Sequence, residues 1–568
     1  MVKRMFGLGI AILFAAFTSA LAAALGLPVA FFDISYLCLN ALLAYSYFQT
    51  TRQNERRLLL VCIVILSFWI ALSVGSYYQP KYNSDLNSER LVAQGILNSG
   101  HLDLSGPTPK QVYYSTFPGL EMTGAILALV ADASLYTFIG HGSLLFGLLA
   151  VVLLYAFYRA LAERGGFAQP SEFANKTVLI ATWSSSFLAF DALTIHQTLD
   201  LVFFSAAFLL LALGRINKET LVLFSLTTVA MIISHNLTPV VFLVFLIVYA
   251  TTTRLLGRYH VRPLVSINRW YFGLFAAALG LFAFISRTPI LLVENAFSAL
   301  TATTAPTALL HAATPSGTKP AWVEALIVMG LASFVIVSSV GFFQIMKSRE
   351  PRLLPLIPLA LSGGVIFILL FLSPFAADPN SPGVQSRGFI YLYLFGAPLF
   401  VTSTMLIKQK IREPRGRMAV EGILVLTLFL TLSVTVFYGL NASFYDNSSP
   451  IAYNDQRLGY PQMYAANTFV LKLHYPNGNT ILAVELSYAM ASGIPSLNIQ
   501  PLSAFASSHG NFTGLLRYEC NHAFILRRDI VAVPDPGYTI SQGDYNNVLR
   551  SDVIFSDGEP FVAWTVCQ

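Results

Sequence analysis

The sequence predicts a polytopic α-helical membrane protein with about thirteen transmembrane helices and a small extracytoplasmic α/β or α+β domain at its C-terminus. Three observations support this fold class. Only 11% of the residues are charged and 55% are apolar, whereas soluble proteins carry about 25% charged residues. Apolar runs of about twenty residues, enough to cross the hydrocarbon layer, recur along most of the chain. The runs are continuous rather than alternating, which favours helices over a β-barrel.

The apolar runs define the predicted spans in chain order. Residues 5–26 also fit a signal peptide, because Lys3 and Arg4 precede an apolar stretch with an Ala-rich end. We expect a retained span there, since a second apolar run starts at once at Pro28. Two pairs of spans are joined so tightly that the total could differ by one or two. The predicted spans are residues 5–26, 28–48, 58–77, 135–159, 176–194, 198–214, 220–235, 237–256, 270–286, 322–345, 353–374, 388–407 and 418–439.

The distribution of Lys and Arg predicts the orientation of these spans. Of the 34 Lys and Arg residues, 22 lie in the N-terminus and the loops on its side, and 6 lie in the opposite loops. Basic residues mark cytoplasmic loops, so we expect a cytoplasmic N-terminus, and an extracytoplasmic loop 77–134 and C-terminal region. The formal charge of +6 then faces anionic lipid headgroups, and no nucleic-acid partner is expected.

The C-terminal region, residues 441–568, is long enough for one small domain. Residues 480–485 and 553–555 are predicted strands, and residues 462–473 a predicted helix. Cys520 and Cys567 lie in this region. In an extracytoplasmic domain these two cysteines are compatible with a disulfide.

Ionisable residues gather near the predicted outer ends of the spans rather than at their centres. Asp85 and Glu89 are four residues apart, so both carboxylates share a face if the segment is helical. Neighbouring carboxylates raise one another's pKa, which suits one of them to act as a general base. The alternative interpretation is an ordinary solvated acidic face.

Three further groups are candidates for substrate binding. Arg387 stands where the chain re-enters the membrane, with Tyr391 one helical turn later, and Arg can bind a phosphate bidentately. The alternative is an interfacial anchor. His196, Gln197 and Asp200 occupy one tight outer turn and His235 the next, where a His can contact a substrate or a metal. The alternative is a structural hydrogen bond at a helix end.

These residues together resemble the GT-C class of integral-membrane glycosyltransferases, which use sugars carried on polyprenyl phosphates. The resemblance rests on Asp85 near the start of an outer loop, a helix ending in Asn98-Ser-Gly100-His101, and the aromatic segment Tyr113-Tyr114-Ser-Thr-Phe117-Pro118. Further on, Ser234-His235-Asn236-Leu-Thr238 is similar to a stretch of archaeal members, and Ser386-Arg387 is similar to the late Arg of the family.

The resemblance implies a division into residues 1–57 as an extra N-terminal transmembrane hairpin, 58–440 as the catalytic membrane module and 441–568 as an outer domain. It assigns the catalytic base to Asp85, with Glu89 as a second acid. It implies that the donor phosphate is held by Arg387, with Tyr391 and Arg287, and that the substrate region includes Tyr113, Tyr114, His196, Gln197, Asp200 and His235. The carboxylates of Asp85 and Asp200 are also candidates to bind a Mg²⁺ or Mn²⁺ ion.

The expected activity is inverting transfer of a single sugar to an acceptor hydroxyl of a protein, lipid or glycan. The Trp-Trp-Asp signature of oligosaccharyltransferase catalytic subunits is missing from the tail, whose single Trp is Trp564, and this disfavours transfer of a whole glycan. Two alternatives stay open. A flippase for a lipid-linked sugar would show two related halves with broken helices. A non-catalytic scaffold for surface-glycan assembly would tolerate the replacement of acidic and basic residues in its outer loops by neutral ones.

Overall fold

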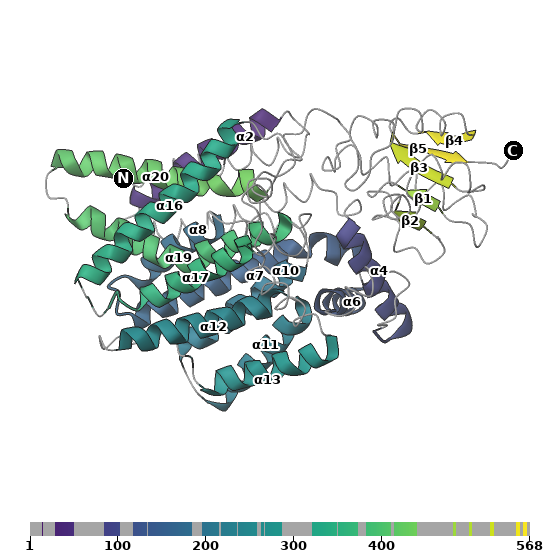
Figure 1. Ribbon diagram of the computed structural model, residues 1–568, viewed down its shortest axis with the longest axis horizontal. Helices are drawn as coiled ribbons and strands as arrows, with labels where there is room; N and C mark the ends of the chain where they lie inside the picture. The colour runs from purple at the N-terminus through teal and green to yellow at the C-terminus, as the bar shows by residue number, and fades with distance from the viewer. Residues whose placement is uncertain are drawn as a thin grey trace. The chain divides into compact units, whose positions relative to one another are not determined.

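The computed structural model describes most helices of the chain and a small sheet (Figure 1). In the described part, thirteen helices and five strands are present. The chain divides into two compact units, residues 1–76 with 142–441 and residues 77–141 with 442–568. The described residues are 29–49, 84–102, 118–132, 135–183, 196–214, 217–235, 237–257, 263–265, 269–286, 321–348, 352–372, 382–410, 414–439, 481–483, 499–501, 523–527, 552–556 and 560–564, with the single positions 14, 267 and 350.

The first unit is a bundle of helices that matches the predicted spans. Each predicted span overlaps one helix, except residues 58–77 and, apart from Phe14, residues 5–26, which lie outside the described residues. The helices are α2 (Val29–Gln49), α7 (Leu135–Arg164), α8 (Pro170–Trp183), α10 (His196–Leu213), α11 (Lys218–Ser234), α12 (Leu237–Leu256), α13 (Arg269–Ser286), α16 (Ala321–Ser348), α17 (Leu356–Leu372), α19 (Pro382–Lys410) and α20 (Pro414–Gly439).

Four of the described helices are long and apolar enough to cross a membrane by length and composition, namely Leu145–Arg164, Leu237–Leu256, Val328–Ser348 and Gly388–Lys408. Large apolar side chains such as Ile336 are exposed along them. A soluble monomer rarely exposes so much contiguous apolar surface. The chain is therefore a multi-pass helical membrane protein, and the total of thirteen spans stays a prediction.

The contacts between helix ends agree with the predicted alternation of spans. Arg164 at the end of α7 donates from Nη1 to the carbonyl oxygen of Ala212 at the end of α10, at 3.1 Å. Lys408 near the end of α19 pairs with Glu421 near the start of α20, at 2.9 Å. All four of these ends were assigned to the cytoplasmic side. Each contact thus brings together two helix ends that were assigned to the same side, while the orientation in the membrane stays a prediction from the Lys and Arg distribution.

Aromatic packing joins α10, α12 and α19 at the centre of this unit. The ring of Phe208 lies 4.5 Å from Phe245 and 5.1 Å from Phe395, and Phe245 stacks on Phe395 at 4.7 Å. All three side chains are fully buried. Each such pair contributes about 0.5–1.5 kcal/mol beyond its buried area. Because lipid is as apolar as these side chains, close packing rather than the hydrophobic effect selects which helices associate.

A buried amide connects α2 to the same bundle. The indole Nε1 of Trp183 donates to Oδ1 of Asn40 at 2.7 Å. The Nδ2 of Asn40 donates to the hydroxyl of Ser433 at 3.2 Å and to the carbonyl of Leu432 at 3.4 Å. A polar side chain inside an apolar span must find such partners. These bonds therefore fix α2 against α8 and α20.

The second unit contains two short helices from the loop 77–134. They are α4 (Ser84–Ser99) and α6 (Gly119–Ala131), and they pack on each other. Ala93 and Ala128 meet in a small apolar core with Leu135. The helix α4 ends at Gly100, whose φ of +73° is readily adopted only by glycine. The helix expected to end in Asn98-Ser-Gly100-His101 is thus present as α4.

A five-stranded sheet forms the described part of the C-terminal region. Its order is β2-β1-β3-β5-β4, with β1 parallel to β2 and β3, and β5 antiparallel to β3 and β4. The strands β1 and β4 coincide with the predicted strands at 480–485 and 553–555. The predicted helix 462–473 lies outside the described residues, so the α/β or α+β assignment stays a prediction. The strands are β1 (Ile481–Ala483), β2 (Ile499–Pro501), β3 (Ala523–Arg527), β4 (Asp552–Ser556) and β5 (Pro560–Trp564).

Two adjacent glycines of α17 give a direct test of the packing between α17 and α19. A Cβ added at Gly363 would lie 2.8 Å from Cβ of Phe395 and 2.9 Å from the carbonyl oxygen of Tyr391. Since neither atom belongs to a flexible chain end, Gly363→Ala must push the helices apart and lower the thermal unfolding midpoint. Gly364→Ala is the matched control, because nothing lies within 4 Å of its added Cβ. It should keep or raise the midpoint. Equal midpoints for the two variants in one detergent would contradict this packing.

Candidate functional site

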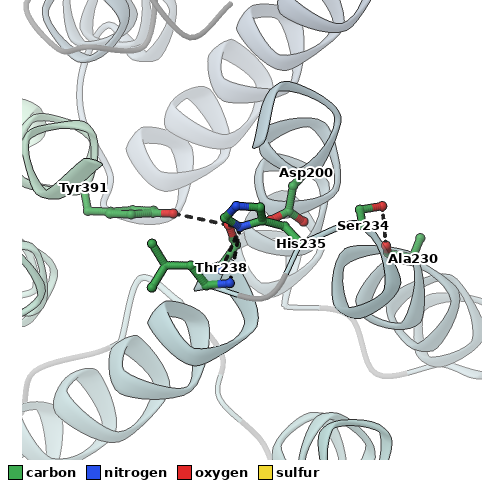
Figure 2. Close-up of polar contacts among 7 residues, drawn as sticks. Asp200, Ala230, Ser234, His235, Thr238 and Tyr391 are labelled. Atoms are coloured by element: carbon green, nitrogen blue, oxygen red, sulfur yellow. Dashed lines mark hydrogen bonds and ion pairs between the residues drawn. The ribbon is translucent and has the colours of Figure 1, made fainter. Parts of the chain in front are cut away.

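Four polar side chains meet where the start of α10, the end of α11, the start of α12 and the third turn of α19 come together (Figure 2). We call Asp200, His235, Thr238 and Tyr391 the polar cluster. Figure 2 shows these side chains turned toward one another, while the Ser234 hydroxyl donates to the carbonyl of Ala230 in its own helix. Asp200, Thr238 and Tyr391 are 0% exposed and His235 is 5% exposed. The cluster is therefore a buried polar site in a largely apolar bundle.

The break between α11 and α12 places His235 in the cluster. His235 has extended backbone geometry, with φ −157° and ψ 147°. The backbone N–H groups of Leu237 and Thr238 donate to its Nδ1 at 3.3 and 3.4 Å. The first turn of a helix has no internal acceptor for its N–H groups, and Pro239 in the same turn has no N–H to satisfy. The imidazole thus caps the start of α12.

Asp200 supplies the negative charge of the cluster. Its Oδ2 lies 3.7 Å from Nδ1 of His235, so the carboxylate stands beside the imidazole. A carboxylate removed from water is costly unless polar groups surround it. The adjacent start of α12 adds the partial positive charge of a helix N-terminus, which favours an acid nearby.

Tyr391 connects the cluster to α19. Its hydroxyl oxygen lies 3.4 Å from Oγ1 of Thr238, and its ring lies 5.5 Å from the ring of Phe204 on α10. Arg387 is four residues earlier on α19, so the two residues share a face of that helix. The buried cluster and the predicted phosphate-binding Arg therefore belong to neighbouring turns of one helix.

The structure brings together three of the residues that the sequence singled out, Asp200, His235 and Tyr391. The spacing argument for Asp85 and Glu89 requires a helix, and α4 contains both. Glu89 is 0% exposed, which disfavours the solvated-face interpretation at that position. The backbones of His196 and Gln197 begin α10, and Arg387 lies in α19, but the side chains of Asp85, His196, Gln197 and Arg387 are outside the described part. So are Arg287, Tyr113, Tyr114, Cys520 and Cys567 in full.

Thr238 is the member of the cluster that the sequence did not single out for a role of its own. Its hydroxyl contacts both His235 and Tyr391. The available signal is its position three residues after His235 at the start of an apolar run, which places a hydroxyl in the first helical turn. Threonines are common in this chain, so spacing alone did not mark it.

The described residues do not complete a metal site. Among them, no three His, Cys, Asp or Glu side chains lie close enough to hold an ion. The cluster offers one carboxylate and one imidazole, which is fewer ligands than a Mg²⁺ or Mn²⁺ site takes from protein and water in octahedral geometry. The expected ion on Asp85 and Asp200 stays a prediction, and no chemical step is derived through a metal.

No protein-family model matches the chain, and no curated protein matches it in sequence. Solved structures do resemble it. An Archaeoglobus fulgidus oligosaccharyltransferase tethered to an acceptor peptide has a TM-score of 0.44 and 12% identity over 78% of this chain. The match covers 63% of that enzyme, less than two thirds of its length.

Two further structures are similar. The oligosaccharyltransferase AglB of Archaeoglobus fulgidus, in complex with an inhibitory peptide and a dolichol-phosphate, has a TM-score of 0.46 and 12% identity, covering 83% of this chain and 69% of that one. ArnT of Cupriavidus metallidurans, bound to undecaprenyl phosphate, has a TM-score of 0.47 and 9% identity, covering 90% and 98%.

Substitutions at His235 test its role as the cap of α12. His235→Ala removes the acceptor of two backbone N–H groups, so we expect a loss of about 0.5–2 kcal/mol in stability. His235→Asn keeps a side-chain acceptor at a capping position and should recover much of that loss. Thermal unfolding of the purified variants in one detergent measures both. Equal destabilisation by Ala and Asn would show that His235 does not cap α12.

Proposed function

We propose that the chain is a membrane glycosyltransferase that moves a single sugar from a polyprenyl-phosphate donor to an acceptor hydroxyl on the outer face, with inversion. The observation that supports this most is the buried polar cluster of Asp200, His235, Thr238 and Tyr391, one helical turn from Arg387. Ionisable residues within membrane helices are costly and mark functional sites by default.

The composition of the cluster suits a lipid-linked sugar phosphate. Arg387 offers a planar guanidinium that can hold two phosphate oxygens at once. Hydroxyl, imidazole and carboxylate groups can exchange hydrogen bonds with the hydroxyls of a sugar. Asp200, His235 and Thr238 lie near helix ends, and Arg387 lies in the second turn of α19. The phosphate of a lipid carrier can therefore reach these groups from the headgroup level while its isoprenoid tail stays in the hydrocarbon layer.

The proposed reaction is a single displacement. The carboxylate of Asp85 takes the proton of the acceptor hydroxyl, and that oxygen attacks the anomeric carbon from the face opposite the phosphate. The bond from the anomeric carbon to the phosphate oxygen breaks, and the electron pair leaves with the polyprenyl phosphate. Arg387, together with Arg287, stabilises the charge that develops on the leaving phosphate. The proposal requires Asp85 and Arg387 to reach one substrate.

The remaining groups have supporting roles in this proposal. Glu89 and Asp200 orient the acceptor, or hold a Mg²⁺ or Mn²⁺ ion through their oxygens. His196, Gln197 and His235 contact the sugar, and Tyr113 and Tyr114 line the acceptor side. The C-terminal domain recognises the protein, lipid or glycan acceptor.

Transfer from a panel of labelled polyprenyl-phosphate sugars, with and without a chelator, tests the activity of the purified chain. Asp85→Asn keeps the shape of the side chain but removes the base, so we expect kcat to fall by about 10²–10⁴-fold. Binding of the donor lipid should change little, which separates loss of chemistry from misfolding. Near-normal transfer by Asp85→Asn would remove this residue from the reaction.

Arg387→Ala should weaken binding of the donor lipid rather than slow the chemical step. Loss of charged hydrogen bonds to a phosphate predicts a rise of about ten- to a hundredfold in KM for the lipid-linked sugar. The control is Arg159→Ala, which removes another Arg of a membrane helix. Arg159 is about half exposed and pairs with Glu163 in its own helix, so its loss should leave KM unchanged. Equal effects of the two variants would contradict a phosphate role for Arg387.

A further inference from the structure

Thr238 connects the start of α12 to the third turn of α19. Its Oγ1 lies 3.2 Å from Nδ1 of His235 and 3.4 Å from the hydroxyl oxygen of Tyr391. The residue is fully buried. Its single hydroxyl thus contacts two polar side chains that belong to different segments of the bundle.

The direction of these hydrogen bonds follows from the cap of α12. The Nδ1 of His235 receives two backbone N–H groups, so it carries a lone pair and acts as an acceptor. Thr238 then donates its one proton to Nδ1, and its oxygen accepts the proton of the Tyr391 hydroxyl. The chain runs from Tyr391 through Thr238 to His235.

Tyr391 is fixed from three sides. Its hydroxyl reaches Thr238 on α12, and its ring lies 5.5 Å from Phe204 on α10. On the side of α17, Gly363 packs against the backbone of Tyr391. A Cβ added at Gly363 would lie 2.9 Å from the carbonyl oxygen of Tyr391. The first two contacts hold a side chain, and the third holds the backbone. Together they set the rotation of α19 about its own axis at this turn.

We propose that Thr238 is a positioning residue for the donor phosphate. By holding Tyr391 it sets the rotation of α19, and through that rotation it directs Arg387, which lies one turn earlier on the same face. This inference rests on the proposed function, in which Arg387 binds the phosphate of the lipid-linked sugar. It assigns to Thr238 an effect on donor binding that acts through another residue.

The test compares Thr238→Val, which keeps the shape and removes the hydroxyl, with Thr238→Ser, which keeps the hydroxyl. Loss of the hydrogen bond to Tyr391 predicts that Thr238→Val raises KM for the lipid-linked sugar about five- to tenfold, with kcat within about twofold. Thr238→Ser should restore KM. The control is Thr228→Val in α11, because the hydroxyl of Thr228 is also buried but bonds only to carbonyls of its own helix. An equal rise in KM for Thr228→Val would overturn the proposal.

Double variants separate positioning from general destabilisation. Tyr391→Phe should also raise KM, because it removes the hydroxyl that bonds to Thr238. Thr238→Val removes the same bond, so the rise in KM of the double variant should be smaller than the product of the two single effects. In an Arg387→Ala background, Thr238→Val should add no further rise in KM. Effects that multiply in either combination would overturn the proposal, as would a fall in kcat without a change in KM.

Binding of undecaprenyl phosphate alone distinguishes this proposal from the proposed function. If the native chain transfers no sugar from any donor, the proposed function fails while carrier binding still tests Thr238. Weaker binding of the carrier by Thr238→Val than by Thr228→Val then supports the positioning role. Equal binding by the two variants overturns it.

Discussion

The packing of aromatic rings between α10, α12 and α19 is the interaction on which the rest of the membrane unit depends. Phe208, Phe245 and Phe395 form its centre, and Phe204 extends it to Tyr391. In lipid these helices gain little from the hydrophobic effect, so the fit of the rings decides how they lie together. That fit brings the start of α12 and the third turn of α19 close enough for Thr238 and Tyr391, distant in sequence, to share a hydrogen bond.

The membrane explains why the polar groups of this unit occur in tight sets. Burying a polar group in hydrocarbon without a hydrogen-bond partner costs roughly several kcal/mol of free energy. Asn40 therefore bonds to Trp183 and Ser433, and His235 bonds to the backbone of α12. The set around Asn40 connects helices and contains no acidic side chain. The polar cluster around His235 includes the carboxylate of Asp200, which is why we assign substrate chemistry to it.

Much of the fold followed from sequence because hydrocarbon thickness imposes continuous apolar runs. The ends of the helices were less accurate, since a helix can continue past its apolar run. The helix α8 starts at Pro170 rather than at 176, because Pro suits the first turn and Lys176 pairs with Glu172 at 2.8 Å. The helix α7 similarly runs to Arg164, past the predicted end at 159, with a pair between Arg159 and Glu163.

The candidate site was predictable as single residues but not as an arrangement. Asp200, His235 and Tyr391 stood out because ionisable or amphipathic side chains are rare at such positions in apolar spans. Their meeting depends on tertiary packing among helices far apart in the chain, which local pattern does not encode. Thr238 was hidden for another reason, since a hydroxyl becomes informative only when its two partners are known.

Photo-crosslinking with a polyprenyl phosphate analogue that carries a photoreactive group beside the phosphate tests the central claim most directly. After irradiation of the full chain in lipid, mass spectrometry identifies the labelled peptides. The account predicts labels in the first two turns of α10, the first turn of α12 and the second and third turns of α19, with unlabelled polyprenyl phosphate competing them away. Labels confined to other parts of the chain, such as α16 and α20, would contradict it.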